Sequence, residues 1–291
     1  METIHTVEWM KQVARQARAE GRIVGLVPTM GALHEGHLSL VRAAQQNCSP
    51  VVVSIFVNAA QFGPTEDLTK YPRPMEQDHA KLENLRVDCL FAPTAAEIYP
   101  DNFRTTVEVG GLSERYEGRS RPGHFRGVAT VVLKLFEMVQ PHFAYFGRKD
   151  AQQARIVRQM VSDLNLATQI VVCPIVREAD GLAMSSRNAY LAPDDRRRAT
   201  VLHRALAAAR REILGGERDA TRLLGCIREV LKAEPAADAN YVELVDADSF
   251  EPVTLLRKQC LVVMAVRVGG VRLLDNMLIE ERAGGGFDVS L

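Results

Sequence analysis

The chain has 291 residues, of which 47% are hydrophobic and 25% are charged, proportions typical of globular proteins. Its 36 basic residues balance 36 acidic ones, so it lacks the net positive charge on which nonspecific nucleic-acid binding depends. The apolar runs are shorter than the roughly 20 residues that a membrane-spanning helix needs. The first residues have neither the basic start nor the apolar core of a signal peptide.

The cysteines indicate a reducing compartment. They are odd in number, scattered, and without C-x-x-C spacing, which is typical of free thiols: Cys48, Cys89, Cys173, Cys226 and Cys260. We therefore expect a cytoplasmic protein, and the balanced charge and short apolar runs predict neither nucleic-acid nor membrane partners.

The first part of the chain alternates short β-branched segments with segments of helical periodicity. Helices are expected near residues 8–18, 38–44, 74–82, 127–139 and 151–165, and strands at residues 22–27, 50–57, 87–92, 142–146 and 168–176. Residues 104–109 are a candidate for a further strand, and residues 117–126 are expected to form a basic loop. The alternation predicts an α/β fold with a doubly wound, Rossmann-like parallel sheet.

The pattern changes after residue 177. Residues 178–188 have no apolar period and are expected to form a loop, followed by a long helix from Pro193 to about Leu214 and a second helix over residues 219–232. Strands are expected at residues 241–246, 261–268 and 271–279, and the glycines at 284–286 are expected in a mobile tail. The sequence thus predicts a first domain over residues 1–178 and a smaller C-terminal α+β domain over residues 179–291.

A histidine-containing turn connects the first long strand to the following helix. Residues 28–37 read P-T-M-G-A-L-H-E-G-H. The start of a helix carries free backbone N–H groups and a partial positive charge, both of which favour a phosphate. Gly31 and Gly36 allow close approach of the backbone, and His34 and His37 share a face of the helix. The turn is therefore a candidate anion site.

Two other interpretations of the histidines stay open from this segment alone. They could bind a metal, although the segment is not H-E-x-x-H and has no obvious third ligand nearby, or they could simply cap the loop. The glycine pattern matches neither the dinucleotide fingerprint nor the P-loop.

Several other polar residues are expected near this turn. The carboxyl ends of parallel strands share one edge of a sheet, so the loops at 28–37, 58–63, 147–153 and 177–188 should converge. Each residue alone could be a solvated charge or a cap, but together they favour nucleotidyl transfer over hydrolysis, because no G-x-S-x-G element is present. These residues are His34, His37, Asn58, Gln61, Lys149, Asp150, Gln153, Ser185, Ser186 and Arg187.

The turn resembles the HIGH-type signature of nucleotidyltransferases, and the M-S-S-R sequence at 184–187 resembles their KMSKS-type loop. More narrowly, the chain resembles the pantoate–β-alanine ligase family. The similar segments span most of the chain: residues 27–38, 54–58, 61–62, 71–73, 121–125, 147–153, 176–188, 265–269 and 272–276.

The resemblance implies a ligase that makes pantothenate in two steps. Pantoate attacks the α-phosphorus of ATP to give pantoyl adenylate and pyrophosphate, and β-alanine then displaces AMP. It also implies a homodimer that uses Mg²⁺. No metal ligands are predicted among the protein side chains, so Mg²⁺ is expected on the ATP phosphates.

The resemblance also implies residue roles. His37, His34 and Lys149 are the catalytic candidates, with both histidines and the lysine on the phosphates and His37 as the proton donor. Gln61 is expected to bind pantoate and later β-alanine, and Gln153 to bind pantoate. The nucleotide is expected to contact Met30, Gly31, Ala32, Leu33, His34, Glu35, Gly36, His37, Gly147, Arg148, Lys149, Asp150, Val176 (at the adenine), Met184, Ser185, Ser186 and Arg187.

Two positions depart from the family pattern. Ala59 stands where a proline is common, and Arg148 replaces an acidic residue. Neither change removes a group with an expected role. The alternatives are another HIGH-type nucleotidyltransferase and a non-enzymatic ATP-binding module.

Overall fold

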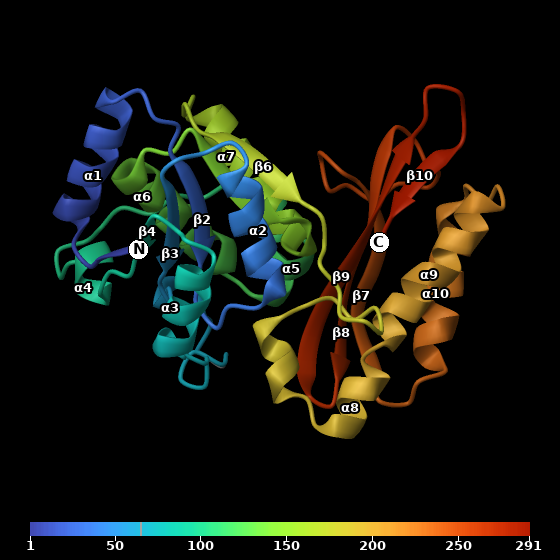
Figure 1. The fold of residues 1–291 in the computed structure, drawn as a ribbon. Coiled ribbons are helices and arrows are strands. Elements are labelled where there is room, and N and C mark those ends of the chain that lie inside the picture. The colour runs from blue at the N-terminus through green and yellow to red at the C-terminus, as the bar shows by residue number, and fades with distance from the viewer. Residues whose placement is uncertain (65) are drawn as a thin grey trace. The chain divides into compact units, whose positions relative to one another are not determined.

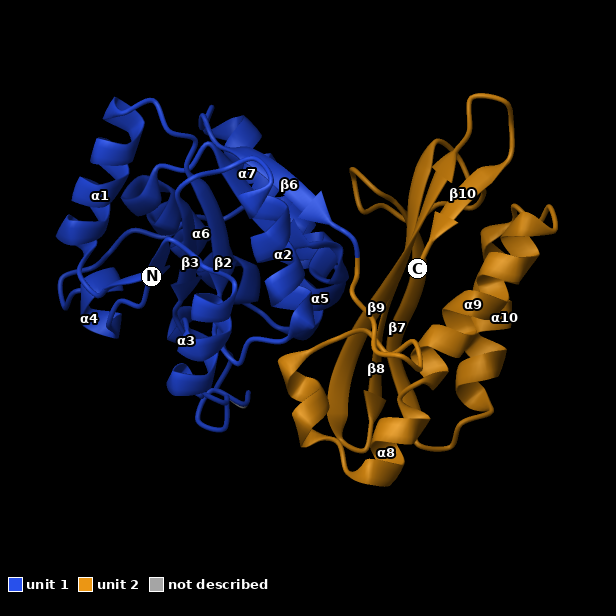
Figure 2. Ribbon diagram, in the orientation of Figure 1, with its two compact units in different colours: residues 1–174 blue, residues 175–291 orange. Residues whose placement is uncertain are grey.

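The computed structural model describes residues 1–64 and 66–291. They form two compact units, Met1–Pro174 and Ile175–Leu291 (Figures 1 and 2). Within the described residues, no helix combines the length and the apolar character needed to cross a membrane. The assignment of residues 1–178 and 179–291 to separate domains stays a prediction.

A six-stranded sheet forms the centre of the first unit, and every neighbouring pair of strands is parallel. The predicted Rossmann-like fold is therefore confirmed. The strand order reverses between β2 and β5, and such a reversal is where open α/β sheets bind ligands. In spatial order the strands are β1 (Glu2–Ile4), β4 (Cys89–Phe91), β3 (Val51–Ile55), β2 (Gly25–Thr29), β5 (Phe143–Gly147) and β6 (Gln169–Cys173).

Helices cover this sheet (Figure 1). On one face, Leu40 and Val41 of α2 and Leu82 of α3 pack in a buried cluster with Val27 and Val53 of the strands. Helix α6 packs between α1 and α7 and against β2. The helices are α1 (Val7–Ala19), α2 (Glu35–Gln45), α3 (Met75–Asn84), α4 (Ala95–Ile98), α5 (Tyr116–Ser120), α6 (His124–Val139) and α7 (Ala151–Asp163).

Two expectations for the first unit were wrong. Residues 104–109 form no strand, because the backbone N–H of Val107 donates to Thr130 Oγ1 on α6, 2.9 Å away, instead of joining a sheet. The expected loop at 117–126 contains most of α5 and the start of α6. Gly123 has a positive φ of 83°, which lets the chain turn from one helix directly into the next.

The second unit is an antiparallel sheet covered by two helices, which confirms the predicted α+β arrangement. Helices α9 (Val201–Leu214) and α10 (Ala220–Lys232) share a buried apolar cluster with the strands, which includes Leu206, Leu223 and Val262. The strands are, in order, β10 (Phe287–Ser290), β9 (Val271–Glu281), β8 (Gln259–Val268) and β7 (Ala237–Asp246).

Two expectations for the second unit were also wrong. The single long helix is divided into α8 (Pro193–Arg198) and α9, since the N–H groups of Thr200 and Leu202 bond to carbonyls three residues back and so tighten the turn around buried Ala199. The glycines at 284–286 lie in the turn of the β9–β10 hairpin, where Gly285 N–H donates to the Arg282 carbonyl.

Candidate active site

The turn after β2 is supported by a buried carboxylate from α3. Gly31 and Ala32 both have positive φ, 84° and 51°. In this conformation the N–H groups of Ala32 and Leu33 face the carboxylate of Asp78. Asp78 accepts from the N–H of Ala32 at 2.7 Å and from that of Leu33 at 2.8 Å. Lys81 Nζ donates to the carbonyl of Leu33 at 2.6 Å. Because Asp78 lies far along the chain, no local pattern pointed to this support.

Both histidines of the turn hold the first turn of α2. His34 is the N-cap, and its Nδ1 accepts from the N–H of Gly36 at 3.2 Å. The N–H of His34 in turn donates to His37 Nδ1 at 3.4 Å. The rings lie 4.1 Å apart, centroid to centroid. Since Nδ1 of each ring is an acceptor, each neutral ring carries its proton on Nε2 and can donate from there. The capping role and a role in anion binding are therefore compatible.

The environment of His37 keeps its imidazole neutral. Burial, with smaller electrostatic contributions from His34, Lys149 and Lys81 and against an opposing effect of Asp150, lowers its pKa from 6.5 to about 3. A group with this pKa is neutral at pH 7 and offers an Nε2–H hydrogen bond. His37 can therefore act as a neutral hydrogen-bond donor, and its role as a proton donor stays a prediction.

Lys149 follows the neighbouring strand β5. Residues Arg148–Asp150 form one 3-10 turn, in which Lys149 Nζ lies 3.5 Å from Asp150 Oδ1. Lys149 lies near enough to His37 for its charge to help lower the pKa of that residue, and the placement of both side chains on the phosphates stays a prediction. Gln153 is half-buried in the first turn of α7. The adjacent Gln152 is buried and donates to the carbonyl of Leu112.

Gln61 follows β3 and contacts the histidine turn. Its Nε2 donates to Met30 Sδ at 3.1 Å, and its Oε1 accepts from Asn58 at 3.0 Å. Helix α6 approaches this loop closely, because a Cβ atom at Gly127 would lie 2.3 Å from the carbonyl oxygen of Ala60. The loops after β2 and β3 therefore meet, as the sequence predicted.

A second set of contacts holds the backbone of Gln61. His124 Nδ1 lies 2.9 Å from the Gln61 carbonyl, and Arg121 donates to His124 Nε2 at 3.0 Å and to Glu66 at 2.6 and 2.8 Å. Burial and the Arg121 charge lower the pKa of His124 to about 4. His124 is therefore neutral and connects Arg121, which donates to its Nε2, with the carbonyl of Gln61, which accepts from its Nδ1. The sequence around His124 did not suggest this role.

The remaining candidate residues belong to the second unit. The N–H of Met184 donates to the carbonyl of Val176 at 3.0 Å, which closes a short hairpin. Ser185 Oγ accepts from the N–H of Arg187 at 3.3 Å and so caps the 3-10 helix Ser186–Tyr190. The approach of Val176, Met184, Ser185, Ser186 and Arg187 to a nucleotide stays a prediction.

Contacts within the second unit, one of them a buried ion pair, fix this hairpin. Arg177 donates two hydrogen bonds, of 2.8 and 2.9 Å, to the carboxylate of Asp275. Arg196 donates to Asp180 at 2.7 Å. Gly181 has a φ of 93°, and a Cβ atom there would lie 2.2 Å from the His203 ring. The shape of the hairpin is therefore set by its contacts with Asp275, Arg196 and His203.

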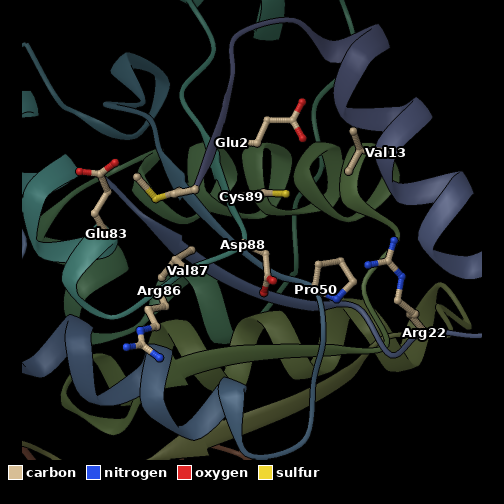
Figure 3. A pocket seen from close by; sticks show the side chains of 10 residues that line it. Glu2, Val13, Arg22, Pro50, Glu83, Arg86, Val87, Asp88 and Cys89 are labelled. Atoms are coloured by element: carbon tan, nitrogen blue, oxygen red, sulfur yellow. The ribbon is translucent and has the colours of Figure 1, made fainter.

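A cavity of about 560 Å³ lies at the opposite, amino-terminal side of the sheet in the first unit (Figure 3). Its lining mixes the basic side chains Arg22 and Arg86 with the carboxylates of Glu2, Glu83 and Asp88. This mixture of charges favours no class of ligand, and the cavity is separate from the candidate site.

The chain matches known proteins over almost its whole length. A family model described as pantoate-β-alanine ligase matches residues 2–278. The pantothenate synthetase of Heliobacterium modesticaldum is 54% identical over 280 residues, which cover 96% of this chain and 100% of that protein.

Solved structures agree with this match. The crystal structure of pantothenate synthetase from Thermus thermophilus has a TM-score of 0.91 at 45% identity and covers 95% of this chain and 98% of its own. That of the pantoate-β-alanine ligase from Francisella tularensis, complexed with β-γ ATP and β-alanine, has a TM-score of 0.77 at 35% identity, with 95% and 97% covered. By its sequence and by its fold, the chain belongs to the pantoate-β-alanine ligase family.

Proposed function

We propose that this enzyme ligates pantoate to β-alanine through a pantoyl-adenylate intermediate. Family membership supports the ligase activity and the use of ATP. The observation that carries the two-step route is the pair of histidines at the start of α2, with two Nε2–H donors beside Lys149. Such a group of donors suits the charge that develops on a departing pyrophosphate.

The first step joins the pantoate carboxylate to the α-phosphorus of ATP, and the bond to pyrophosphate breaks. Lys149 and the Nε2–H groups of His34 and His37 stabilise the negative charge of the leaving group. The nucleotide lies along residues 30–37 and 147–150, with Val176 at the adenine and Met184, Ser185, Ser186 and Arg187 closing over the triphosphate.

The second step joins the β-alanine nitrogen to the acyl carbon, AMP leaves with the bonding electrons of the acyl–oxygen bond, and the nitrogen releases one proton. Gln61 binds pantoate in the first step and β-alanine in the second, while Gln153 binds pantoate. A loop that excludes water at this stage protects the acyl adenylate from hydrolysis. The hairpin at residues 176–184 and the segment after it are the proposed lid.

Mg²⁺ is proposed as a companion of the ATP phosphates. The described residues, 1–64 and 66–291, contain no group of three or more His, Cys, Asp or Glu side chains placed to hold a metal ion. Mg²⁺ commonly keeps several waters and binds through phosphates and one or two carboxylates. Asp150, half exposed beside Lys149, is a carboxylate that could contribute one such contact. The ion, when bound, neutralises phosphate charge.

Pyrophosphate exchange into ATP tests the two-step route. Exchange that needs pantoate but not β-alanine is the expected result. Exchange without pantoate would favour another nucleotidyltransferase. Binding of ATP with no exchange under any condition would favour a non-enzymatic ATP-binding module.

Two further properties are proposed from the family and the sequence. We expect a homodimer, which light scattering would test by giving twice the mass of one chain. We also expect a cytoplasmic enzyme, a location consistent with five cysteines that are all free thiols. Fractionation of cells that express the protein would test this location.

A further inference from the structure

A directed series of hydrogen bonds leads from Tyr99 to the side chain of Gln61. Tyr99 follows α4, and its hydroxyl donates to Asn58 Oδ1 at 2.9 Å. Asn58 Nδ2 then donates to Gln61 Oε1 at 3.0 Å and to the carbonyl of Gly127 at 3.1 Å. Asn58 is 1% exposed, so these contacts replace its contacts with water.

Two contacts set the orientation of the Asn58 amide, one from Tyr99 and one to the Gly127 carbonyl, and that orientation in turn sets the orientation of Gln61. A side-chain amide can present either its oxygen or its nitrogen to a neighbour. In Asn58 the nitrogen lies between two carbonyl oxygens, which only accept, and the oxygen faces the hydroxyl of Tyr99. The oxygen of Gln61 is thereby occupied, and its nitrogen faces the histidine turn at Met30.

The position of Tyr99 suits it to be a permanent donor. Its ring packs 6.2 Å from that of Phe56 and 5.0 Å from that of Phe103, centroid to centroid. Burial raises the pKa of its hydroxyl to about 12, so the proton is retained over the range in which the enzyme can be assayed.

We propose that Tyr99 is a positioning residue that sets which end of the Gln61 amide faces the acid substrate. With its nitrogen toward the histidine turn, Gln61 offers N–H donors there, and the substrate group that it selects is an oxygen acceptor, such as a hydroxyl or carboxylate oxygen. This inference rests on the proposed role of Gln61 and deepens it, because it names the chemistry of the substrate group.

Kinetics of Tyr99→Phe test the inference. The ring and its packing remain, but Asn58 Oδ1 loses its donor, so that only the Gly127 carbonyl still holds the Asn58 amide and the hold on Gln61 weakens. The KM for pantoate should rise about 5- to 10-fold, the effect of one buried hydrogen bond, while the KM for ATP stays unchanged. Tyr145→Phe is the matched control, since it removes the buried hydroxyl 3.5 Å from Cys48 Sγ and should leave both constants unchanged.

A double-mutant cycle separates positioning from a general structural effect. If Tyr99 acts through Gln61, then Tyr99→Phe should have no further effect on the KM for pantoate when Gln61 is already Ala. An unchanged KM in the single Tyr99→Phe variant, or the same rise in both backgrounds, would overturn the inference.

A readout independent of catalysis keeps the inference distinct from the proposed function. The side-chain amide NMR signals of Asn58 and Gln61 should shift in Tyr99→Phe and not in Tyr145→Phe. Unshifted signals would overturn the inference even if the enzyme is active. Failure of the wild-type protein to make pantothenate would instead overturn the proposed function, with the NMR result still deciding the role of Tyr99.

Discussion

The carboxylate of Asp78 lies 2.7 Å from the backbone nitrogen of Ala32, so α3 holds the turn that carries the histidines. Asp78→Asn replaces one accepting oxygen by an NH₂ group that cannot accept. Since hydrogen bonds to a charged group contribute more than neutral ones, we expect kcat/KM for ATP to fall about 10- to 100-fold in the exchange assay.

Asp88→Asn is the control for this change. Asp88 also accepts from a backbone N–H, that of Val51 at 2.8 Å, but it lines the cavity at the far side of the sheet (Figure 3). The kcat/KM of the Asp88→Asn variant for ATP should stay near that of the wild type. Equal losses in the two variants would argue against a specific role of Asp78.

The low pKa of His37 favours a role as a neutral hydrogen-bond donor. His37→Ala should lower the exchange rate about 10²- to 10³-fold, as for removal of one donor to a developing charge. His37→Gln should recover part of this rate, because its amide keeps an N–H group. Since the pKa of His37 is about 3, kcat/KM for ATP should show no step from this residue between pH 5 and 8. If Gln is as poor as Ala, proton transfer by His37 becomes the better account.

Lys149→Ala should lower the exchange rate about 10²- to 10³-fold, because the charge beside the departing pyrophosphate is lost. Lys149→Arg keeps the charge and should retain more activity than Ala. Lys11→Ala, on α1, is a control for the loss of one positive charge. A Lys149→Ala variant as active as Lys11→Ala would remove Lys149 from the site.

His124 should make stability depend on pH. Its pKa is about 4 in the folded protein and 6.5 ordinarily, so the unfolded chain takes up a proton at higher pH than the folded one. The free energy of unfolding is therefore largest near pH 7 and falls as the pH drops from 6.5 towards 4. The contribution of this residue at pH 5 is a loss of about 2 kcal/mol, measured by urea unfolding at pH 7 and pH 5.

A variant without the titrating imidazole of His124 should have an unfolding free energy that depends less on pH. His124→Gln should lose less stability between pH 7 and pH 5 than the wild type does. His5→Gln, at an exposed position of the first unit, should show the wild-type difference. An unchanged difference in His124→Gln would contradict a neutral, buried His124.

Gly127→Ala tests the close approach of α6 to the Gln61 loop. The added Cβ would lie 2.3 Å from the Ala60 carbonyl, so the backbone must shift, at a cost of about 1–3 kcal/mol in unfolding free energy. Gly225→Ala in α10 meets nothing within 4 Å and should instead stabilise the protein by up to about 1 kcal/mol. Thermal unfolding compares the two, and a stable Gly127→Ala variant would show that the loop can yield.

Features with a local pattern were predictable from the sequence. The alternation of strand and helix indicated the parallel sheet, and the segment from Pro28 to His37 indicated an anion site at the start of a helix. Segments too short to show a period were not predictable, such as β1, which is held by its pairing with β4. The break after α8 depends on the packing of Ala199, which periodicity alone does not reveal.

The parts of the site that sequence did not reveal depend on contacts between distant segments. Asp78, Tyr99 and His124 reach the loops only once the sheet is assembled. The neutral state of His37 likewise arises from burial and from Lys81 and Lys149. A residue type and its spacing can indicate that a histidine is functional, but its charge is a property of the assembled surroundings.

The hairpin at residues 176–184 depends for its shape on Asp275, Arg196 and His203, all in the same unit as the hairpin itself. The three residues that hold the hairpin therefore lie in the same unit of the chain as the hairpin. Exchange of residues 175–291 between relatives would move the proposed lid together with the residues that hold it. Exchange of the M-S-S-R segment alone would separate it from Asp275, Arg196 and His203. When the shape of this hairpin is to be kept, residues 175–291 are therefore the segment to exchange.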